Sequence, residues 1–524
     1  MRVVQGTAPP SGVDRSVRPS ERAGRGLRTA ALLVLGLLSA CNTTGEACDA
    51  CAATTGALSP APVADPRVEA EQRARNALAA LPEAAAARAG EGPSLDDVKP
   101  FAAPKAAPSK PATLSEAVTR ALADNPQIGL AVARYDEASA LVRVAQAPLY
   151  PQAEASVAGG HGLTGSYATA VGDYWSTKNA MGAARVETNL SARQLLFNFG
   201  ATAADVDRAA RTMDAQALQS VATAEDVAFS VSQAYMKLLQ QRELLKLADE
   251  NLAALKDIAR LVDENERNGN ATLADVKRAR ARVLDAQTFR SDQDYELHLA
   301  TDRFRRLARA EPGALRAPRP LTGSIPANKD VALQEAYRAN PAILSLQSSI
   351  AAGKRELDAV KLGTLPTLNL EAGVTGKHNA GEKNKTELDV RTVAALRYKL
   401  LDGGLQSAQI DQAVSRIVQQ EMKLQSQKDD IEADLRQFYW QLESARGKQA
   451  GLSDGVETSL KARELYNEQF RGGKRTLLEL LDVETAYFNA RRTQITNRFD
   501  EQLATFGIIK SVGRFVRTVV GTRA

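Results

Sequence analysis

The stretch Gly269–Val276 (GNATLADV) returns in related form as Gly473–Leu480 (GKRTLLEL), 204 residues farther along the chain. Asparagines flank Gly269, and Gly472 precedes Gly473, so each copy supplies a flexible turn. A helix is expected to return from each turn, over about 272–309 and 476–510. The duplicated stretch therefore predicts two helical hairpins, each with a turn at its far tip.

The segments before these turns predict unusually long helices. No obvious helix breaker interrupts residues 200–267, and the corresponding segment covers 404–471. At 1.5 Å per residue, roughly 65 helical residues reach about 100 Å, which is too long for a globular core. Such helices have to pack lengthwise against others, as in a coiled coil or a helical barrel.

The duplication extends beyond the hairpins. The 204-residue spacing also holds for the pairs Leu196/Leu400, Gly200/Gly404 and Tyr235/Tyr439. Nearer the N-terminus the spacing is 215 residues, as in Asn125/Asn340 and Pro151/Pro366. The 11-residue difference falls between Pro151 and Leu196, so the first copy has a longer loop there. Two tandem copies of one unit are predicted, over 113–328 and 329–515.

Inside each unit the hydrophobic period changes from helical to two and back. From Val186 to Arg193 apolar and polar residues alternate, and the same alternation covers 367–374 and 388–397. We expect strands at about 152–163 and 184–199 in the first copy, and at about 367–376 and 388–400 in the second. These lengths suit tilted strands that cross a bilayer in a barrel, although the alternation equally fits a half-buried soluble sheet.

Four strands per chain cannot close a barrel, and open sheet edges are not tolerated in lipid. Several chains would have to pool their strands, and three chains give 12, a number within the usual range. Closure alone would also be satisfied by two or four chains. The predicted fold class is mainly α with a contribution to a membrane β-barrel.

The N-terminus has the pattern of a secretory signal over residues 1–40. Arg22, Arg25 and Arg28 precede an apolar run that is too short to span a membrane. The run ends in Leu38–Cys41 (LSAC), which resembles the bacterial lipobox, whose cysteine receives a lipid. Cys41 would then be the lipidated N-terminus, and Asn42 favours the outer membrane by the same resemblance. In the alternative reading, an ordinary signal is cleaved nearby and Cys41 is incidental.

Two further segments are expected to lie outside the repeats. Residues 41–112, rich in Ala and Pro, read as a tether or wrapping arm, and 516–524 as a C-terminal tail. Within the tether, Cys48 and Cys51 suggest a local disulfide or an inert pair, because no second pair and no histidine lies nearby.

The composition argues against two other classes of protein. The three histidines are far apart in sequence, and no spacing of a catalytic triad or a metal site is visible, so neither an enzyme nor a cofactor is expected beyond the covalent lipid. The net charge of +5 is spread along the chain without a basic block, which gives no support to nucleic-acid binding.

Residues 473–482 (GKRTLLELLD), followed by 487–490 (YFNA), resemble the TolC family of outer-membrane factors, and the resemblance covers roughly 113–515. It implies a homotrimer, with a β-barrel in the outer membrane continued by an α-helical barrel across the periplasm. It also implies a periplasmic adaptor and an inner-membrane ABC or RND transporter as partners, in type I protein secretion, drug efflux or both.

In that family polar contacts and acidic rings near these turns hold the periplasmic end shut. Carried over by position, Arg475 matches the gating arginine and Asp275 the carboxylate that it pairs with, while Glu479 and Asp482 match the acidic rings. Two residues depart from the family pattern: Phe470 stands in place of a tyrosine, and Glu479 in place of an aspartate. Without the resemblance, these charges would read as a solvated helix face.

Two alternatives to a channel compete for the sequence. A periplasmic adaptor would flank one hairpin with lipoyl-like and β-barrel segments, whereas this chain repeats its strands and its helices. A coiled-coil scaffold lipoprotein would have no use for four strands with alternating faces. The cargo, protein or small molecule, is not indicated by the sequence.

Overall fold

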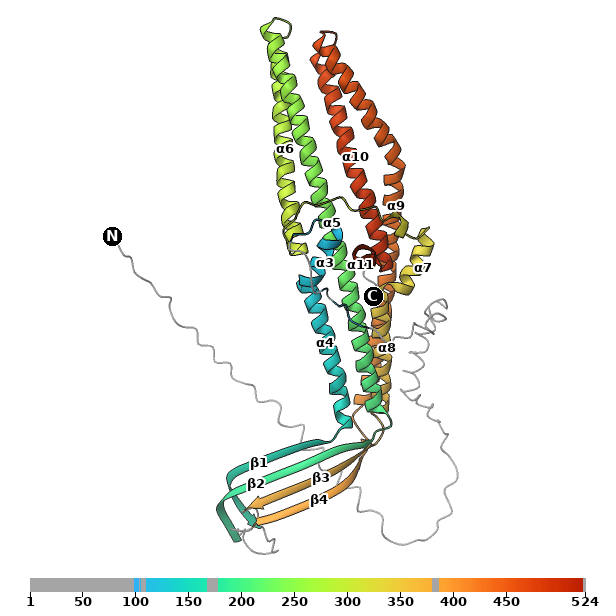
Figure 1. Ribbon diagram of the computed structural model, residues 1–524. Helices are drawn as coiled ribbons and strands as arrows, with labels where there is room; N and C mark the ends of the chain where they lie inside the picture. Colours follow the sequence, from blue (N-terminus) through green and yellow to red (C-terminus); the bar gives the residue numbers. More distant parts are fainter. Residues whose placement is uncertain (1–98, 103, 105–109, 167–177, 379–385, 522–524) are drawn as a thin grey trace, which may run out of the picture. The chain divides into compact units, whose positions relative to one another are not determined.

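The computed structural model describes residues 99–102, 104, 110–166, 178–378 and 386–521 (Figure 1). The predicted signal, with Cys41, Cys48 and Cys51, lies outside these residues, as does most of the tether. Two copies of one element order make up the rest. The first copy consists of α3 (Leu114–Asp124), α4 (Pro126–Gln146), β1 (Gln152–Ser166), β2 (Lys178–Phe197), α5 (Ala201–Arg267) and α6 (Leu273–Ala308). The second consists of α7 (Lys329–Ala339), α8 (Pro341–Leu362), β3 (Thr367–His378), β4 (Thr386–Arg397), α9 (Leu405–Arg471) and α10 (Leu477–Val512).

The repeated Asn-Pro steps divide the two short helices that open each copy. The side chain of Asn125 accepts a hydrogen bond from the backbone N–H of Gln127 at 2.9 Å, and Asn340 accepts one from Ala342 at 2.9 Å. The prolines that follow occupy the first helical position, where a missing N–H costs nothing. Each step therefore ends one helix and starts the next without an unsatisfied donor.

The long helices α5 and α9 have 67 residues each, over the predicted ranges. Helix α5 packs against α6, α8 and α4, and α9 against α10 and α8, so the two hairpins run lengthwise along their neighbours (Figure 1). Alanines such as Ala217, Ala224 and Ala228 are fully buried along α5, and their small side chains allow a close approach of the helices. None of the described helices has both the length and the apolar character needed to cross a membrane.

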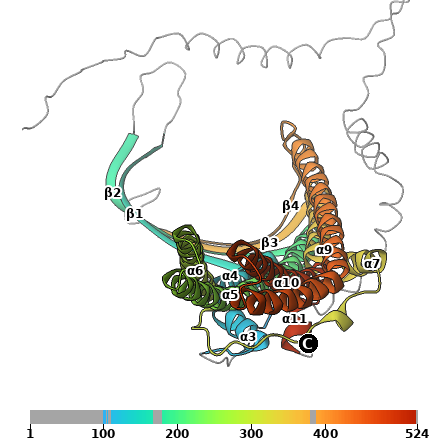
Figure 2. The same ribbon diagram turned by 90° about the horizontal axis from the view of Figure 1, so that it is seen from above.

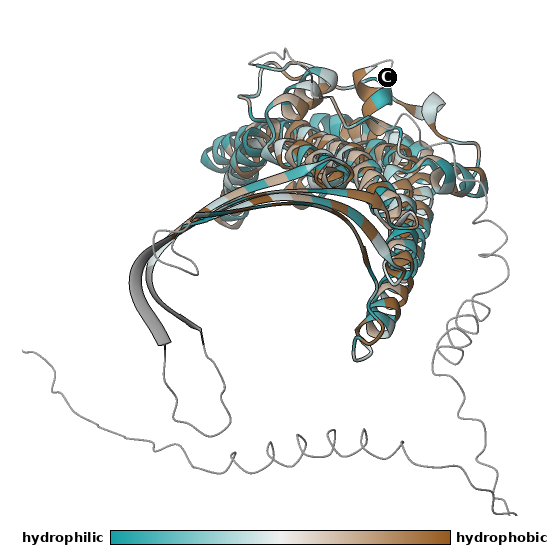
Figure 3. Ribbon diagram, turned by 90° about the horizontal axis from the view of Figure 1, so that it is seen from below, coloured by the Kyte–Doolittle hydropathy of each residue, from teal (hydrophilic) through white to brown (hydrophobic). Residues whose placement is uncertain are grey.

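The four strands form one antiparallel sheet in the order β1-β2-β3-β4, which is curved when seen from above (Figure 2). The strand register aligns the alternating apolar and polar positions of each strand with those of its neighbour. Leu190 lies opposite Val374, which lies opposite Val390, so the apolar positions share one face. Figure 3 shows hydrophobic and hydrophilic bands following each other along the strands. In the isolated chain the apolar face is bare, with Leu388 72% and Val390 65% exposed.

The other face of the sheet carries the charges. Glu371 of β3 pairs with Arg397 of β4 at 2.6 Å and with Arg193 of β2 at 3.4 Å. Farther along the strands, Lys377 lies 3.7 Å from Glu187. Ion pairs therefore connect three strands on this face, and the sheet has one polar and one apolar surface.

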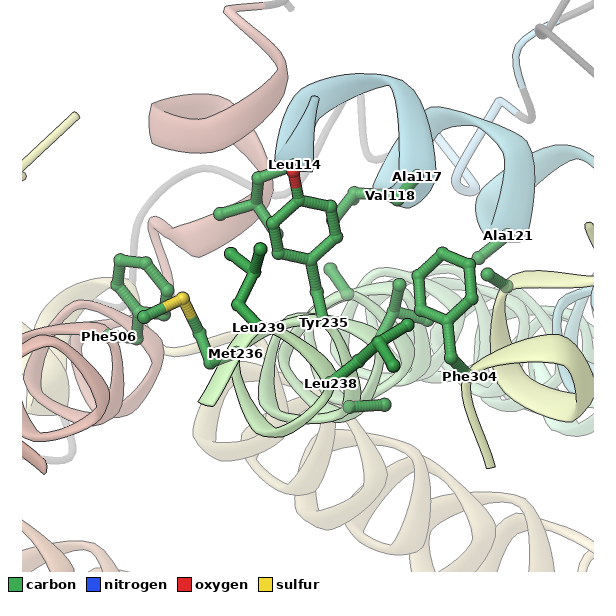
Figure 4. Packing of buried hydrophobic residues seen from close by; sticks show 14 of the residues in the cluster. Leu114, Ala117, Val118, Ala121, Tyr235, Met236, Leu238, Leu239, Phe304 and Phe506 are labelled. Atoms are coloured by element: carbon green, nitrogen blue, oxygen red, sulfur yellow. The ribbon is translucent and has the colours of Figure 1, made fainter. Parts of the chain in front are cut away.

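The largest apolar core surrounds Tyr235 of α5 (Figure 4). Its ring is fully buried against residues of α3 and α6, among them Leu114 and Phe304. Its hydroxyl has the carbonyl oxygens of Arg316 (2.7 Å) and Ala112 (3.0 Å) as acceptors for its one proton, and it accepts from the Arg316 N–H at 3.2 Å. One side chain thus fixes the start of the first copy and the loop that leads to the second.

A pair of matched substitutions tests this role. Tyr235→Phe is expected to cost about 1–2 kcal/mol of stability, because it leaves part-buried backbone groups of Ala112 and Arg316 without this partner. Tyr439→Phe, at the equivalent position of the second copy, should cost less, since its hydroxyl bonds Pro326 and Asn328 in a less buried site. Denaturant unfolding of the purified protein, followed by circular dichroism, measures both. Equal losses would contradict the special role of Tyr235.

Residues on both sides of the repeats pack against the helical core. Within the predicted tether, Phe101 packs against the Tyr235 core and its N–H donates to Ser220 Oγ at 2.8 Å. At the other end, Phe515–Val520, which includes the first residues of the predicted C-terminal tail, forms a short helix, α11, and Phe515 is fully buried. The backbone N–H groups of Phe515 and Val516 donate to the buried carboxylate of Glu225 at 2.9 and 3.2 Å.

Candidate functional site at the hairpin tips

The two hairpins turn with the same backbone geometry. Gly269 and Gly473 have φ of +74° and +70°, in the left-handed region that favours glycine. In the first turn the Asn270 N–H donates to Asn265 O at 2.7 Å, and in the second the Lys474 N–H donates to Gln469 O at 2.8 Å. Gly472 has φ of −83°, which other residues adopt, so of the three predicted turn glycines only Gly269 and Gly473 are required by the backbone.

The return helices begin with equivalent capping boxes. The Asp275 carboxylate accepts from the Thr272 hydroxyl at 2.7 Å and from its N–H at 3.2 Å. The Glu479 carboxylate accepts from the Thr476 N–H and hydroxyl, both at 2.9 Å. Hydrogen bonds from the Thr272 side chain hold the pKa of Asp275 below its usual value, and the Thr476 backbone N–H does the same to the pKa of Glu479. Both carboxylates therefore stay charged and are anchored to their own helices.

The predictions from sequence missed this capping role, although the pattern Thr-x-x-Asp/Glu at both turns indicates it. Asp275 and Glu479 were assigned different gating roles, yet they occupy equivalent positions of the repeat, 204 residues apart. Asp275 also lies 3.7 Å from Arg278 in its own helix. A gating role of Asp275 or Glu479 therefore has to be compatible with these capping contacts, which the carboxylates keep.

Arg475 has three contacts, all within the α9/α10 hairpin. Its Nη1 donates to Glu479 Oε1 at 2.7 Å and its Nε to Gln469 Oε1 at 3.0 Å. Its guanidinium carbon lies 4.5 Å from the ring centroid of Tyr466. The hydrogen bond to Glu479 raises the pKa of Arg475 above its usual value, so the side chain remains a cation. Among the described ion pairs of one chain, none joins Arg475 to Asp275.

The other predicted gate residues differ in their surroundings. Asp482 is exposed on α10. Phe470 packs against a tip cluster formed by α5, α6 and α10. The buried members of the tip cluster are Leu255, Ile258, Val262, Val276, Ala279, Ala286, Leu477, Leu480 and Leu481. This cluster holds the two hairpins of one chain together near their turns, and it gives Phe470 an apolar place to occupy.

A second arginine–carboxylate pair lies nearby in the same hairpin and was not predicted. Glu484 of α10 is only 2% exposed, and Arg463 of α9 donates to it at 2.8 Å. The Arg463 guanidinium carbon also lies 4.9 Å from the ring centroid of Tyr487. The arrangement repeats that of Arg475 with Glu479 and Tyr466, but the carboxylate is buried.

A groove of about 490 Å³ runs between α5 and α6. Charged side chains of both signs line it, among them Arg260, Asp263 and Arg280. Arg280 reaches across the hairpin to Asp263 at 3.4 Å. In the described part of the chain no group of histidine, cysteine or acidic residues could hold a metal ion.

In comparison with known proteins, both copies of the repeat match the same protein family. The model of the family described as "Outer membrane efflux protein" matches residues 117–308 and 332–514. "Outer membrane efflux protein BepC" of Brucella suis is 23% identical over 419 residues, which cover 78% of this chain and 87% of that protein. "Pyoverdine export outer membrane protein OpmQ" of Pseudomonas aeruginosa is 23% identical over 423 residues, which cover 76% of this chain and 85% of that protein.

A solved structure also resembles this chain in fold. The structure of the outer-membrane channel OprN matches with a TM-score of 0.66 at 18% identity, covering 81% of this chain and 98% of that one. The match extends over most of this chain, so the fold as a whole has a counterpart in a solved structure.

Proposed function

The chain belongs to the outer membrane efflux protein family, a family of outer-membrane channels, and we propose that three copies of it assemble into one export tunnel. In this tunnel the sheets form a 12-stranded barrel in the outer membrane, and the hairpins form a helical barrel in the periplasm. The family match covers both copies of the repeat, which supports the channel over an adaptor built around a single hairpin.

One observation carries the proposal of a shared barrel. The sheet has an apolar and a polar face, and it ends at β1 on one edge and at β4 on the other. Unpaired strand edges are not tolerated in lipid, so the β4 edge of one chain has to pair with the β1 edge of another. The exposed apolar face would then meet lipid and the charged face water. Closure permits several copy numbers, and three is the number that the family resemblance implies.

The channel activity is tested by purifying the protein from the outer membrane and adding it to planar lipid bilayers. We expect discrete single-channel steps from a narrow, mostly closed pore. Val390→Asp should prevent insertion, because it places a charge on the apolar face of the sheet. Arg391→Asp, at the next position of β4 and therefore on the opposite face, is the matched control and should still insert. Absence of any conductance from correctly folded wild-type trimers would contradict the proposal.

The hairpin tips are proposed to gate this tunnel. Arg475 links to Asp275 of the adjacent helix pair, and Glu479 and Asp482 form acidic rings that favour cations in the narrowed pore. An exposed arginine–carboxylate link is specific in geometry but weak, so docking of a partner can break it. Phe470 cannot contribute the hydrogen bond of the family's tyrosine, which leaves Arg475 as the polar link.

The partners are proposed to be a periplasmic adaptor and an inner-membrane ABC or RND transporter. The charged groove between α5 and α6, near the first tip, supports a docking surface for the adaptor. The transporter then selects the cargo, in protein secretion or in efflux. Site-specific crosslinking from the tip turns, followed by mass spectrometry, identifies the adaptor that docks there.

A lipid on Cys41 is proposed to anchor the chain in the outer membrane. Cells labelled with radioactive palmitate should incorporate the label into the wild-type protein, whereas Cys41→Ser should incorporate none. Cys48→Ser, which changes a cysteine outside the lipobox, is the control and should keep the label. Labelling of Cys41→Ser would contradict the lipid site.

A further inference from the structure

The two turns are alike in backbone but unlike in the chemistry that they offer. Arg475 corresponds in the repeat to Ala271, and Tyr466 to Val262. The first tip therefore lacks both the cation and the aromatic ring, while it keeps the carboxylate of Asp275. One tip offers a donor and the other an acceptor, a pairing that can repeat from one subunit to the next around a ring.

The contacts of Arg475 hold its guanidinium group in place from two sides. The guanidinium carbon lies over the ring of Tyr466, 4.5 Å from the ring centroid. Gln469 and Glu479 accept from Nε and Nη1 at 3.0 and 2.7 Å. The side chain of Arg475 is still 37% exposed, so it can reach a further partner.

The donors of this guanidinium group are only partly used. Arginine has N–H groups on Nε, Nη1 and Nη2, arranged in a fixed plane. Among the described residues no side chain or carbonyl accepts from Nη2 of Arg475. Arg475 can therefore bind a second carboxylate through Nη2 without releasing Gln469 or Glu479.

We propose that Tyr466 is a positioning residue of the gate: with Gln469 it forms a cradle that orients Arg475 so that Nη2 faces a carboxylate outside its own hairpin. The acceptor is the Asp275 carboxylate of the adjacent helix pair, which is held in place by its bonds to Thr272. The cradle keeps the arginine ordered before the link forms, so that less side-chain freedom is lost when the gate closes. This inference rests on the proposed gating role of the tips.

The test compares single-channel conductance of the purified trimer in planar bilayers. Tyr466→Leu is expected to raise the open-to-closed ratio about threefold, since the guanidinium loses its platform but keeps its charge. Tyr466→Phe keeps the aromatic face and should behave as wild type. In the double variant with Arg475→Ser, Tyr466→Leu should add nothing, because the residue that it positions is gone.

The matched control is Tyr487→Leu, which removes the ring that lies against Arg463 in the same hairpin. It should leave gating unchanged. An effect of Tyr466→Leu that persists in the Arg475→Ser background would overturn the inference, since Tyr466 would then act through packing in the tip cluster. An unchanged conductance of Tyr466→Leu would overturn it as well. A wild-type protein without any conductance would instead refute the channel itself.

Discussion

Replacing Arg475 by serine is expected to open the channel. The substitution removes the cation that links adjacent helix pairs, once in every subunit, and leaves the helix start intact because Thr476 still caps it through Glu479. Three exposed links that act together should shift the open-to-closed ratio by roughly tenfold. Single-channel recording in planar bilayers measures this shift directly, as a larger mean conductance.

The control for this variant is Arg471→Ser. Arg471 is exposed at the end of α9, and no described carboxylate pairs with it, so the control removes the same charge beside the same turn. Its conductance should match that of wild type. If Arg475→Ser conducts like wild type, or if both variants open the pore equally, the proposed latch is wrong.

The C-terminal helix α11 is expected to hold more tightly at mildly acidic pH than at alkaline pH. Burial raises the pKa of Glu225 to about 7, against the hydrogen bonds from Val516 and Phe515, which lower it. Asp226 nearby raises this pKa further, and Lys510 lowers it. When α11 detaches and exposes Glu225 to water, we expect its pKa to fall toward the usual value of 4.5.

The sign of the effect follows from these two pKa values. The attached state binds the proton more tightly, so its stability is complete below the detached pKa and declines as pH rises through the attached pKa. Between pH 5.5 and pH 8 detachment should become roughly 30-fold more favourable, which corresponds to about 2 kcal/mol. Hydrogen exchange at the amides of Phe515 and Val516, corrected for the intrinsic pH dependence of exchange, reports this change.

Two variants isolate the carboxylate. Glu225→Gln keeps an acceptor oxygen without a titrating proton and should remove the pH dependence. Asp429→Asn changes the equivalent position of the second copy, which is exposed, and should leave the pH dependence intact. Protection of α11 that rises with pH, or that is independent of pH in the wild type, would contradict this role of Glu225.

The four strands and the helices of the two hairpins were readable from the sequence because their signals are local. Helix α6 was expected to end near residue 309 and ends at Ala308, and β4 was expected near 388–400 and covers Thr386–Arg397. Glycines, prolines and alternating side chains decide such boundaries within a few residues. The order of strands in the sheet, with β2 of one copy against β3 of the other, depends on pairing between distant segments and was not predicted.

Helix α11 could not be predicted from the composition of the C-terminal residues. Six residues have no clear period of their own. Phe515 is buried because its ring packs against Phe229 and Phe506, while Glu225, 290 positions earlier, accepts its N–H. The residues around Phe515 show no sequence pattern that would indicate this long-range hydrogen bond to a buried carboxylate.

The position of the turn near Arg475 could be predicted from the sequence, whereas the contacts of Arg475 could not, and its gating role stays a prediction. The family motif places Arg475 at a turn, and the turn is there. Its neighbours Tyr466 and Gln469 come from the preceding helix, and only the way α9 folds back on α10 brings them to it. Whether Arg475 reaches Asp275 depends on a second subunit and stays a prediction.

The most direct measurement of the central claim is an SDS gel of fractionated cells, run with and without heating. A tunnel of three chains should be found in the outer-membrane fraction and should migrate as a trimer when unheated and as a monomer of about 56 kDa or slightly less after boiling. Recovery of the protein in the soluble periplasm, or as a monomer in both lanes, would contradict the account.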